Sequence, residues 1–216
     1  MSRITWKEGK VISIELKDGI HCIAQMTKSP YLVFFNTFNE GSDWKNINLS
    51  EIPILFVQAV TKQFIKKSNI QEVKITPVKN IDIPNRWIHS DTGMRKVIIW
   101  EGTEYEKEFI TLGKMGASLV EKDILKKEKY EHPSGIFDKI LIQSIDKSDN
   151  DTIENHELTS VEVYPNLNER LYLCYKLGKN VNPQKEILFD KKDLPKDYKT
   201  FVDIISGKVQ LSDIGY

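Results

Sequence analysis

The sequence predicts an α+β fold: an N-terminal antiparallel β-meander or small barrel, further strands, and C-terminal helices packed on the sheet. The first observation is the alternation of apolar and polar residues over 11–17, which is typical of a strand with one buried face. The second is the pair Asp18-Gly19 that follows it, because Asp-Gly is a strong signal for a two-residue hairpin turn. The third is two amphipathic helical patterns, over 166–178 and 195–207.

The rest of the meander follows directly. We expect a return strand over 20–27 that ends before Pro30, since proline cannot donate to a ladder. The apolar run 31–35 predicts a third strand, and the polar stretch 36–48 predicts a long loop. Trp44 lies in that loop and is a candidate partner contact, because Trp is enriched at binding hot spots. The alternative is that it packs back over the barrel.

Beyond the meander, apolar runs and turn signals predict further strands and one short helix. The strands are expected over 53–60, 72–78, 96–100, 106–112, 136–145 and 185–189. The helix is expected over 61–67, with Thr61 as its cap. In the longer helix, Asn166 and Glu169 have the spacing of a capping box, and Gly178 is the expected stop. The polar segment 146–155 is expected to be a solvated loop.

A length of 216 residues fits a single domain, 1–216. Within it we expect two sub-halves that pack together, a β-rich half over 1–80 and an α+β half over 85–216. The segment 79–85 is the candidate connection between them, because proline residues bracket it and it is short.

Charge and cysteine content narrow the class of protein. Lys plus Arg and Asp plus Glu both number 31, so no basic excess favours non-specific nucleic-acid binding. Cys22 and Cys174 lie in apolar surroundings and are expected to be buried free thiols in a reducing cytosol. The sequence shows no signal-peptide pattern and no apolar run of membrane-spanning length. We therefore expect a soluble cytoplasmic protein without membrane association.

No motif in the sequence predicts catalysis. The histidines are scattered and share no metal-ligand spacing; they are His21, His89, His132 and His156. The G-x-S-x-G motif is absent, and no cofactor or metal is expected. The prediction is a protein that is not an enzyme, with a hydrolase assembled from distant residues as an alternative.

A second alternative is a nucleic-acid-binding β-barrel module. Aromatic side chains interleaved with lysine on a small barrel can stack on single-stranded bases. Phe34, Phe35, Trp44 and Lys45 form the one cluster of this kind in the sequence. The neutral net charge argues against this alternative, and no direct nucleic-acid contact is expected.

Three stretches carry a family resemblance. They are W-K-E-G-K-V-I-S-I-E-L-K-D-G over 6–19, P-I-L-F-V over 53–57 and I-P-N-R-W over 83–87. Together they resemble the immunity proteins of bacterial polymorphic-toxin systems, and most of all immunity protein family twenty-six. In that family an aromatic or basic residue and a glycine precede an alternating strand and a hairpin turn. Lys10 stands where the family has an acidic residue.

The resemblance implies a cytoplasmic antitoxin that binds a cognate toxin domain, as in contact-dependent inhibition, and needs no catalytic residues. If the toxin is a nuclease, its cleft is basic, and an acidic surface would steer association. The most acidic run lies between 146 and 157. The candidate partner-binding residues are Trp44, Asp149, Asp151, Glu154 and Glu157. The alternative for the acidic run is a solvated loop without a partner.

Overall fold

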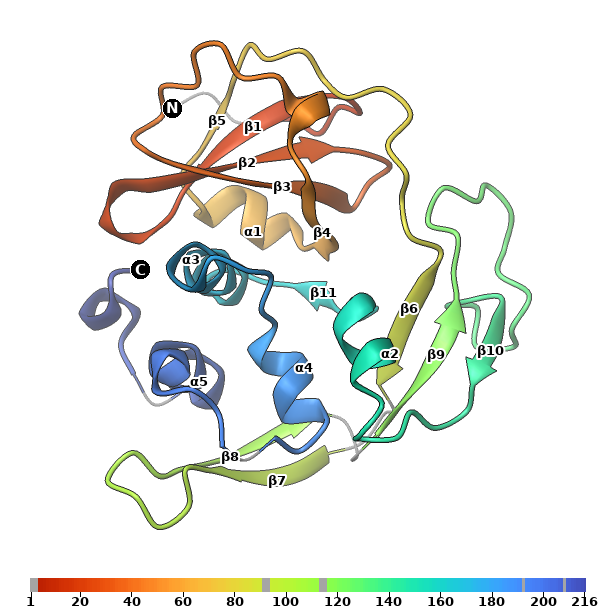
Figure 1. Cartoon of the computed structure of the whole chain (residues 1–216), viewed down its shortest axis with the longest axis vertical. Coiled ribbons are helices and arrows are strands. Elements are labelled where there is room, and N and C mark those ends of the chain that lie inside the picture. Colours follow the sequence, from red (N-terminus) through yellow and green to blue (C-terminus); the bar gives the residue numbers. More distant parts are fainter. Residues whose placement is uncertain (1–3, 91–93, 113–115, 192, 208) are drawn as a thin grey trace. The chain divides into compact units, whose positions relative to one another are not determined.

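The computed structural model describes residues 4–90, 94–112, 116–191, 193–207 and 209–216. The chain forms two compact units (Figure 1). Unit 1 comprises Met1–Asp82, Val161–Val181 and Gln210–Tyr216, and unit 2 comprises Ile83–Ser160 and Asn182–Val209. The mixed α+β class predicted from the sequence is confirmed.

Unit 1 is built on a six-stranded sheet that curls into a half-barrel, with the strand order β11-β4-β3-β2-β1-β5 (Figure 1). The strands are β1 (Val11–Glu15), β2 (Ile20–Met26), β3 (Tyr31–Glu40), β4 (Ile54–Val60), β5 (Ile70–Glu72) and β11 (Val161–Glu162). The neighbours pair antiparallel except β11, which runs parallel to β4. The predicted meander is therefore present in the order β1-β2-β3.

The turn between β1 and β2 has the predicted chemistry. Asp18 and Gly19 both have positive φ, 57° and 70°, and this is the conformation that the two central residues of a type I′ turn require. Glycine adopts it without a Cβ clash, and aspartate tolerates it better than most residues. The turn sets the register that places Ile14 opposite Cys22, with both side chains buried.

Two predictions about the strands of unit 1 are wrong. The loop expected over 36–48 begins only after Glu40, because β3 continues past a bulge and pairs with β2 as far as Ile20. The strand expected over 72–78 stops at Glu72. Beyond it the buried Gln25 side chain takes the place of a neighbouring strand, donating to the carbonyl of Val78 at 3.0 Å and accepting from its N–H at 2.8 Å.

Two helices complete unit 1, α1 (Lys62–Lys67) and α3 (Asn166–Leu177). Helix α1 begins as predicted, since the Thr61 hydroxyl accepts a hydrogen bond from the N–H of Phe64 at 3.2 Å. Helix α3 ends as predicted at Gly178, which is left-handed at φ 65°. The predicted capping box is wrong: Pro165 occupies the cap position, and the Glu169 side chain is buried in ion pairing instead.

Unit 2 contains a three-stranded sheet in the order β10-β9-β6 and a separate two-stranded hairpin, β7-β8. Their bounds are β6 (Arg86–Ser90), β7 (Met94–Ile99), β8 (Lys107–Leu112), β9 (Ala117–Glu121) and β10 (Lys139–Ile142). The hairpin over 94–112 and the strand within 136–145 confirm the predictions for those segments.

The helices of unit 2 correct two further predictions. They are α2 (Asn150–Asn155), α4 (Pro183–Leu188) and α5 (Lys199–Ser206). The segment 146–155 is not all loop, because Asp149 caps α2 and buried Ile153 anchors it. The strand expected over 185–189 is helical, because Asn182 caps α4 and Pro183 occupies its first turn, where proline is favoured. The helix predicted near the C-terminal end is α5, which stops at Gly207.

In the described part of the chain, short 3-10 turns occur at Lys17–Gly19, Leu49–Glu51, Lys196–Tyr198 and Leu211–Ile214. Among the described residues, no helix has both the length and the apolar character needed to cross a membrane.

Candidate functional site

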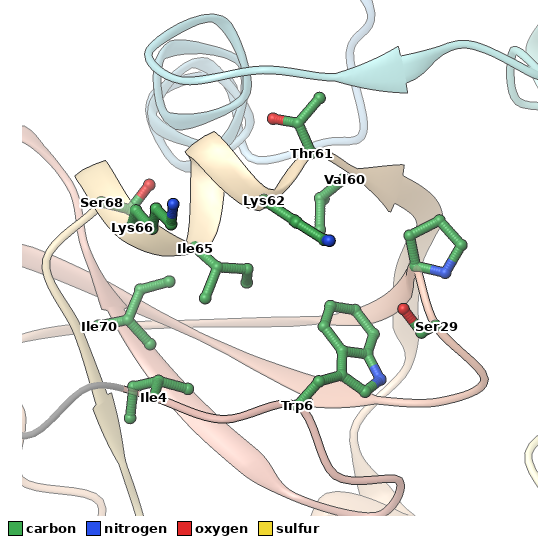
Figure 2. A pocket seen from close by; sticks show the side chains of 11 residues that line it. Ile4, Trp6, Ser29, Val60, Thr61, Lys62, Ile65, Lys66, Ser68 and Ile70 are labelled. Atoms are coloured by element: carbon green, nitrogen blue, oxygen red, sulfur yellow. The ribbon is translucent and has the colours of Figure 1, made fainter.

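A pocket of about 700 Å³ opens in unit 1 between the segment that precedes β1, the turn between β2 and β3, and helix α1 (Figure 2). We call it the Trp6 pocket. Its apolar lining comes from Ile4, Trp6, Pro30, Val60, Ile65 and Ile70. Its polar lining comes from Ser29, Thr61, Lys62, Lys66 and Ser68. The volume lies in the range of small-molecule sites, roughly 300–1,000 Å³.

Trp6 forms one wall of the pocket and is held in place by the sheet. Its indole Nε1 donates a hydrogen bond to the carbonyl of Thr27 at 2.9 Å. The chain that follows is tied to the same strand, because Gly9 donates from its N–H to the carbonyl of Met26 at 2.8 Å. The indole is half-buried, and Figure 2 shows it extending into the pocket. A fixed aromatic face is therefore presented to whatever enters.

Helix α1 forms the opposite wall. Lys62 and Lys66 are four residues apart, so they share one face of the helix, with Ile65 beside them. Buried Phe64 points the other way and anchors the helix to the core. Both lysines are exposed, and neither forms an ion pair with any residue that the structure describes. The rim on this side therefore carries two uncompensated positive charges.

The hydroxyl groups of the lining differ in whether they are already hydrogen-bonded within the protein or can bind a ligand. Ser68 is buried and donates to Asn168 Oδ1 at 3.0 Å, so its role is to fix α1 to α3. The oxygen of Thr61 caps α1. The Ser29 hydroxyl has no hydrogen-bond partner among the described residues. The pocket thus offers apolar contact, a hydroxyl group and positive charge, and its described lining includes no carboxylate.

Trp44, a predicted partner contact, lies in unit 1 but does not line this pocket. It is half-buried, and its indole Nε1 donates to the hydroxyl of buried Ser13 in β1 at 3.0 Å. The ring therefore packs back on the sheet, which was the alternative stated for it, while part of its surface stays open to solvent.

The predicted acidic residues all belong to unit 2 and have different local roles. Asp149 accepts a hydrogen bond from the N–H of Thr152 at 3.0 Å, and hydrogen bonding by the side chain and then the backbone of Thr152 lowers the pKa of Asp149. Glu157 is half-buried and accepts from Asn182 Nδ2 at 3.3 Å. Asp151 and Glu154 are exposed on α2. Of the four acidic residues, only these last two are exposed, and their carboxylates have no hydrogen-bond or ion-pair partner among the described residues.

The aromatic cluster considered for nucleic-acid stacking is not presented to solvent. Phe34 and Phe35 are 0% and 1% exposed, and the ring of Phe34 packs against Phe56 with centroids 4.8 Å apart. Lys45 pairs with Asp43 at 2.8 Å. Stacking of bases on these two phenylalanine rings would require the sheet to open.

The two thiol groups of unit 1 are buried, and the neighbouring His21 is half-buried. Cys22 and Cys174 are buried free thiols, as predicted, and burial raises the pKa of Cys22. His21 in the adjacent position lies against the Ser13 hydroxyl, with Nδ1 and Oγ 3.3 Å apart. Within the described parts of both units, no three His, Cys, Asp or Glu side chains are grouped closely enough to hold a metal ion.

The pocket residues Trp6, Lys62 and Lys66 are not among the site residues that the sequence predicts. In the sequence, Trp6 is the first residue of the first resembling stretch, and both lysines fall within the helix expected over 61–67. One signal was present: the i, i+4 spacing of the two lysines beside Ile65 predicts a helix face that is basic and apolar together. Nothing local indicates that this face lies opposite Trp6.

Comparison with known proteins yields one family. A family model described as a domain of unknown function, DUF8309, matches residues 1–192. The match includes the whole lining of the Trp6 pocket and all of α2. No curated protein matches the chain, and no solved structure matches it.

Proposed function

The chain belongs to the DUF8309 family of domains of unknown function, and from this premise we propose that it is a non-catalytic immunity protein. In this proposal it binds a cognate bacterial toxin domain and neutralises it by covering a surface that the toxin needs. The resemblance carried by residues 6–19, 53–57 and 83–87 implies this class of protein.

The observation that carries the proposal is that the first resembling stretch begins at a wall of the Trp6 pocket. The aromatic residue that opens the motif, Trp6, is a wall of the pocket, and the Gly9 that follows ties this wall to β2. The second stretch, 53–57, enters β4, whose last residue Val60 also lines the pocket. A motif that otherwise looks purely structural therefore shapes a concave surface with a fixed aromatic wall.

Such a surface suits protein binding. Interface energy concentrates in a few aromatic or basic anchors that lose water completely, and each such anchor contributes about 2 kcal/mol or more. Trp6 is pre-organised by its hydrogen bond to Thr27, so little rotamer entropy is lost when a partner covers it. In the proposal, an apolar side chain of the toxin enters the pocket beside Trp6.

The acidic face of α2 has a different part in the proposal. Asp151 and Glu154 are exposed on the same short helix of unit 2. If the toxin is a nuclease with a basic cleft, these carboxylates raise the association rate by long-range attraction, and the effect weakens with salt. We place the protein in the cytoplasm, because its two buried free thiols suit a reducing compartment.

The proposal is tested by co-expression with the cognate toxin domain, which is to be sought as the C-terminal domain of a protein encoded directly upstream of this gene. We expect growth to be restored and the two proteins to co-purify through size-exclusion chromatography. An unrelated toxin domain serves as control and should remain toxic, since immunity depends on one complementary surface. Continued killing by the neighbouring toxin domain, with this protein present and folded, would overturn the proposal.

A further inference from the structure

We propose that the Trp6 pocket is a binding site for a small amphipathic monocarboxylate, a molecule with an aromatic or aliphatic body and one carboxylate group. This inference concerns a free small molecule and does not depend on the proposed toxin-binding function. It stands on three features of the pocket: its charge, its apolar lining and its size.

Some lysines of unit 1 have carboxylate partners, but among the described residues the two lysines at the pocket do not. Lys10 pairs with Glu72 at 2.9 Å, and Lys17 pairs with Glu169 at 2.5 Å. Lys62 and Lys66, by contrast, have no ion-pair partner within the described residues. Two ammonium groups on one helix face also repel each other mildly. An anion bound at this rim relieves that repulsion and finds no described carboxylate in the lining to oppose it.

The apolar lining specifies the other end of the ligand. The side chains of Trp6, Ile65 and Ile70 are half-buried, so each still exposes apolar surface inside the pocket. Removing such surface from water contributes about 25 cal/mol per Å². Figure 2 shows these three side chains on facing sides of the space, with Lys62 extending from α1 above them. A flat or extended apolar body fits between the indole and α1, while its carboxylate reaches the lysines.

The lining favours a carboxylate over a phosphate. Phosphate sites commonly use glycine-rich loops whose backbone N–H groups surround the anion, or arginine forks. The described lining has neither glycine nor arginine. Two lysines and the unpartnered Ser29 hydroxyl supply enough donors for one carboxylate group. The pocket volume of about 700 Å³ accommodates a ligand of drug-like size.

Isothermal titration calorimetry with two isosteric probes tests the inference on the full chain. The probes are 1-naphthylacetate and its neutral analogue 1-naphthylacetamide. We expect the wild-type protein to bind the acid about tenfold more tightly than the amide, as two partly exposed charge contacts would produce. Equal affinity for the two probes, or no binding of the acid, would overturn the inference.

Variants of α1 locate the effect. Lys62→Gln with Lys66→Gln should lower the affinity for the acid to that for the amide and leave the amide unchanged. Lys67→Gln is the matched control, because Lys67 is exposed on the same helix but does not line the pocket. All three positions are exposed, so the fold is preserved, and circular dichroism checks this. An equal loss in the Lys67→Gln control would contradict the assigned site.

Discussion

The hydroxyl of Tyr216 donates a hydrogen bond to the carboxylate of Glu169 at 2.6 Å, although 46 residues separate them in the chain. Lys17 pairs with the same carboxylate at 2.5 Å. Glu169 is buried, and its side chain is 2% exposed. One buried acid of α3 therefore joins the turn of the first hairpin to the segment Gln210–Tyr216, all within unit 1.

The first prediction concerns this buried ion pair. Glu169→Ala should lower the free energy of unfolding by about 3–5 kcal/mol, because it leaves the lysine partner without its counter-charge. Adding Lys17→Met should recover part of that loss, since the uncompensated ammonium is removed. Urea unfolding of the wild type, the two single variants and the double variant completes the cycle. Additive losses would show that the two side chains do not interact.

The second prediction concerns alkaline pH. The hydrogen bond to Asp18 raises the pKa of Tyr172 to about 12, from an unfolded value of about 10. A raised pKa in the folded state means that this stabilisation is fully present below pH ~10 and is lost as pH rises toward 12. Tyr172→Phe should therefore lose less stability than the wild type over this interval.

Urea midpoints at pH 9, 10, 11 and 11.5 measure this effect. Phenylalanine keeps the ring that lies under the Lys17 ammonium, 4.8 Å from the ring centroid, so the variant removes only the hydroxyl group. Burial and Glu169 also raise the pKa of Tyr216, so Tyr216→Phe should reduce the remaining slope further. Parallel pH profiles for wild type and Tyr172→Phe would contradict the prediction.

The third prediction separates the electrostatic and structural roles of α2. Asp151→Lys with Glu154→Lys should slow association with a basic toxin domain at low salt by about tenfold or more, since steering contributes 10–10³-fold. The helix should remain folded, because Asp149 still caps it. Stopped-flow association at two salt concentrations measures the change. An unchanged rate at low salt would show that this face does not meet the partner.

Asp149 needs a separate control. Asp149→Ala should lower the free energy of unfolding by about 1 kcal/mol, because the N–H of Thr152 loses its acceptor. Any effect of Asp149→Ala on toxin binding would result from the loss of the helix cap and not from the loss of charge. The pair Asp151 and Glu154 is therefore the sharper test of charge.

Short-range chemistry explains which parts of the fold could be predicted. The Asp18-Gly19 turn and the Thr61 cap depend on a few adjacent residues, and both are present. A strand is predicted over 185–189, where the structure has helix α4, although the cap residue Asn182 and the following Pro183 are present in the sequence. The strand prediction for that segment rests on the apolar side chains of 187–189 and does not take the helix cap into account. The return of Val161–Val181 to unit 1 depends on long-range packing, which no local pattern encodes.

The candidate site also depends on long-range packing that the local sequence does not encode. Trp6 and α1 lie on opposite sides of the pocket because the sheet places the segment before β1 opposite the end of β4. The sequence shows that the segment 146–157 is acidic. Which of its acidic residues caps the helix, which is half-buried and which two are exposed depends on the helix that forms there. Residue type alone could not distinguish those roles.

The fourth prediction compares two tryptophans of unit 1 that have similar burial and similar hydrogen bonding, but of which one lines the pocket and the other does not. Both are half-buried, and each indole donates a hydrogen bond, from Trp6 to Thr27 at 2.9 Å and from Trp44 to Ser13 at 3.0 Å. Only Trp6 lines the pocket. Trp6→Ala should therefore weaken the toxin complex by about 2 kcal/mol, roughly 30-fold, as loss of a hot-spot anchor does.

Trp44→Ala is the matched control, and its main effect should be on stability. Ser13 keeps a neighbour in His21, so the loss of the indole should lower the free energy of unfolding modestly and leave the complex intact. Surface plasmon resonance on variants that circular dichroism shows to be folded compares the two affinities. A larger loss of affinity for Trp44→Ala than for Trp6→Ala would contradict the prediction. It would place the interface at the loop after β3 and leave the pocket open to solvent in the complex.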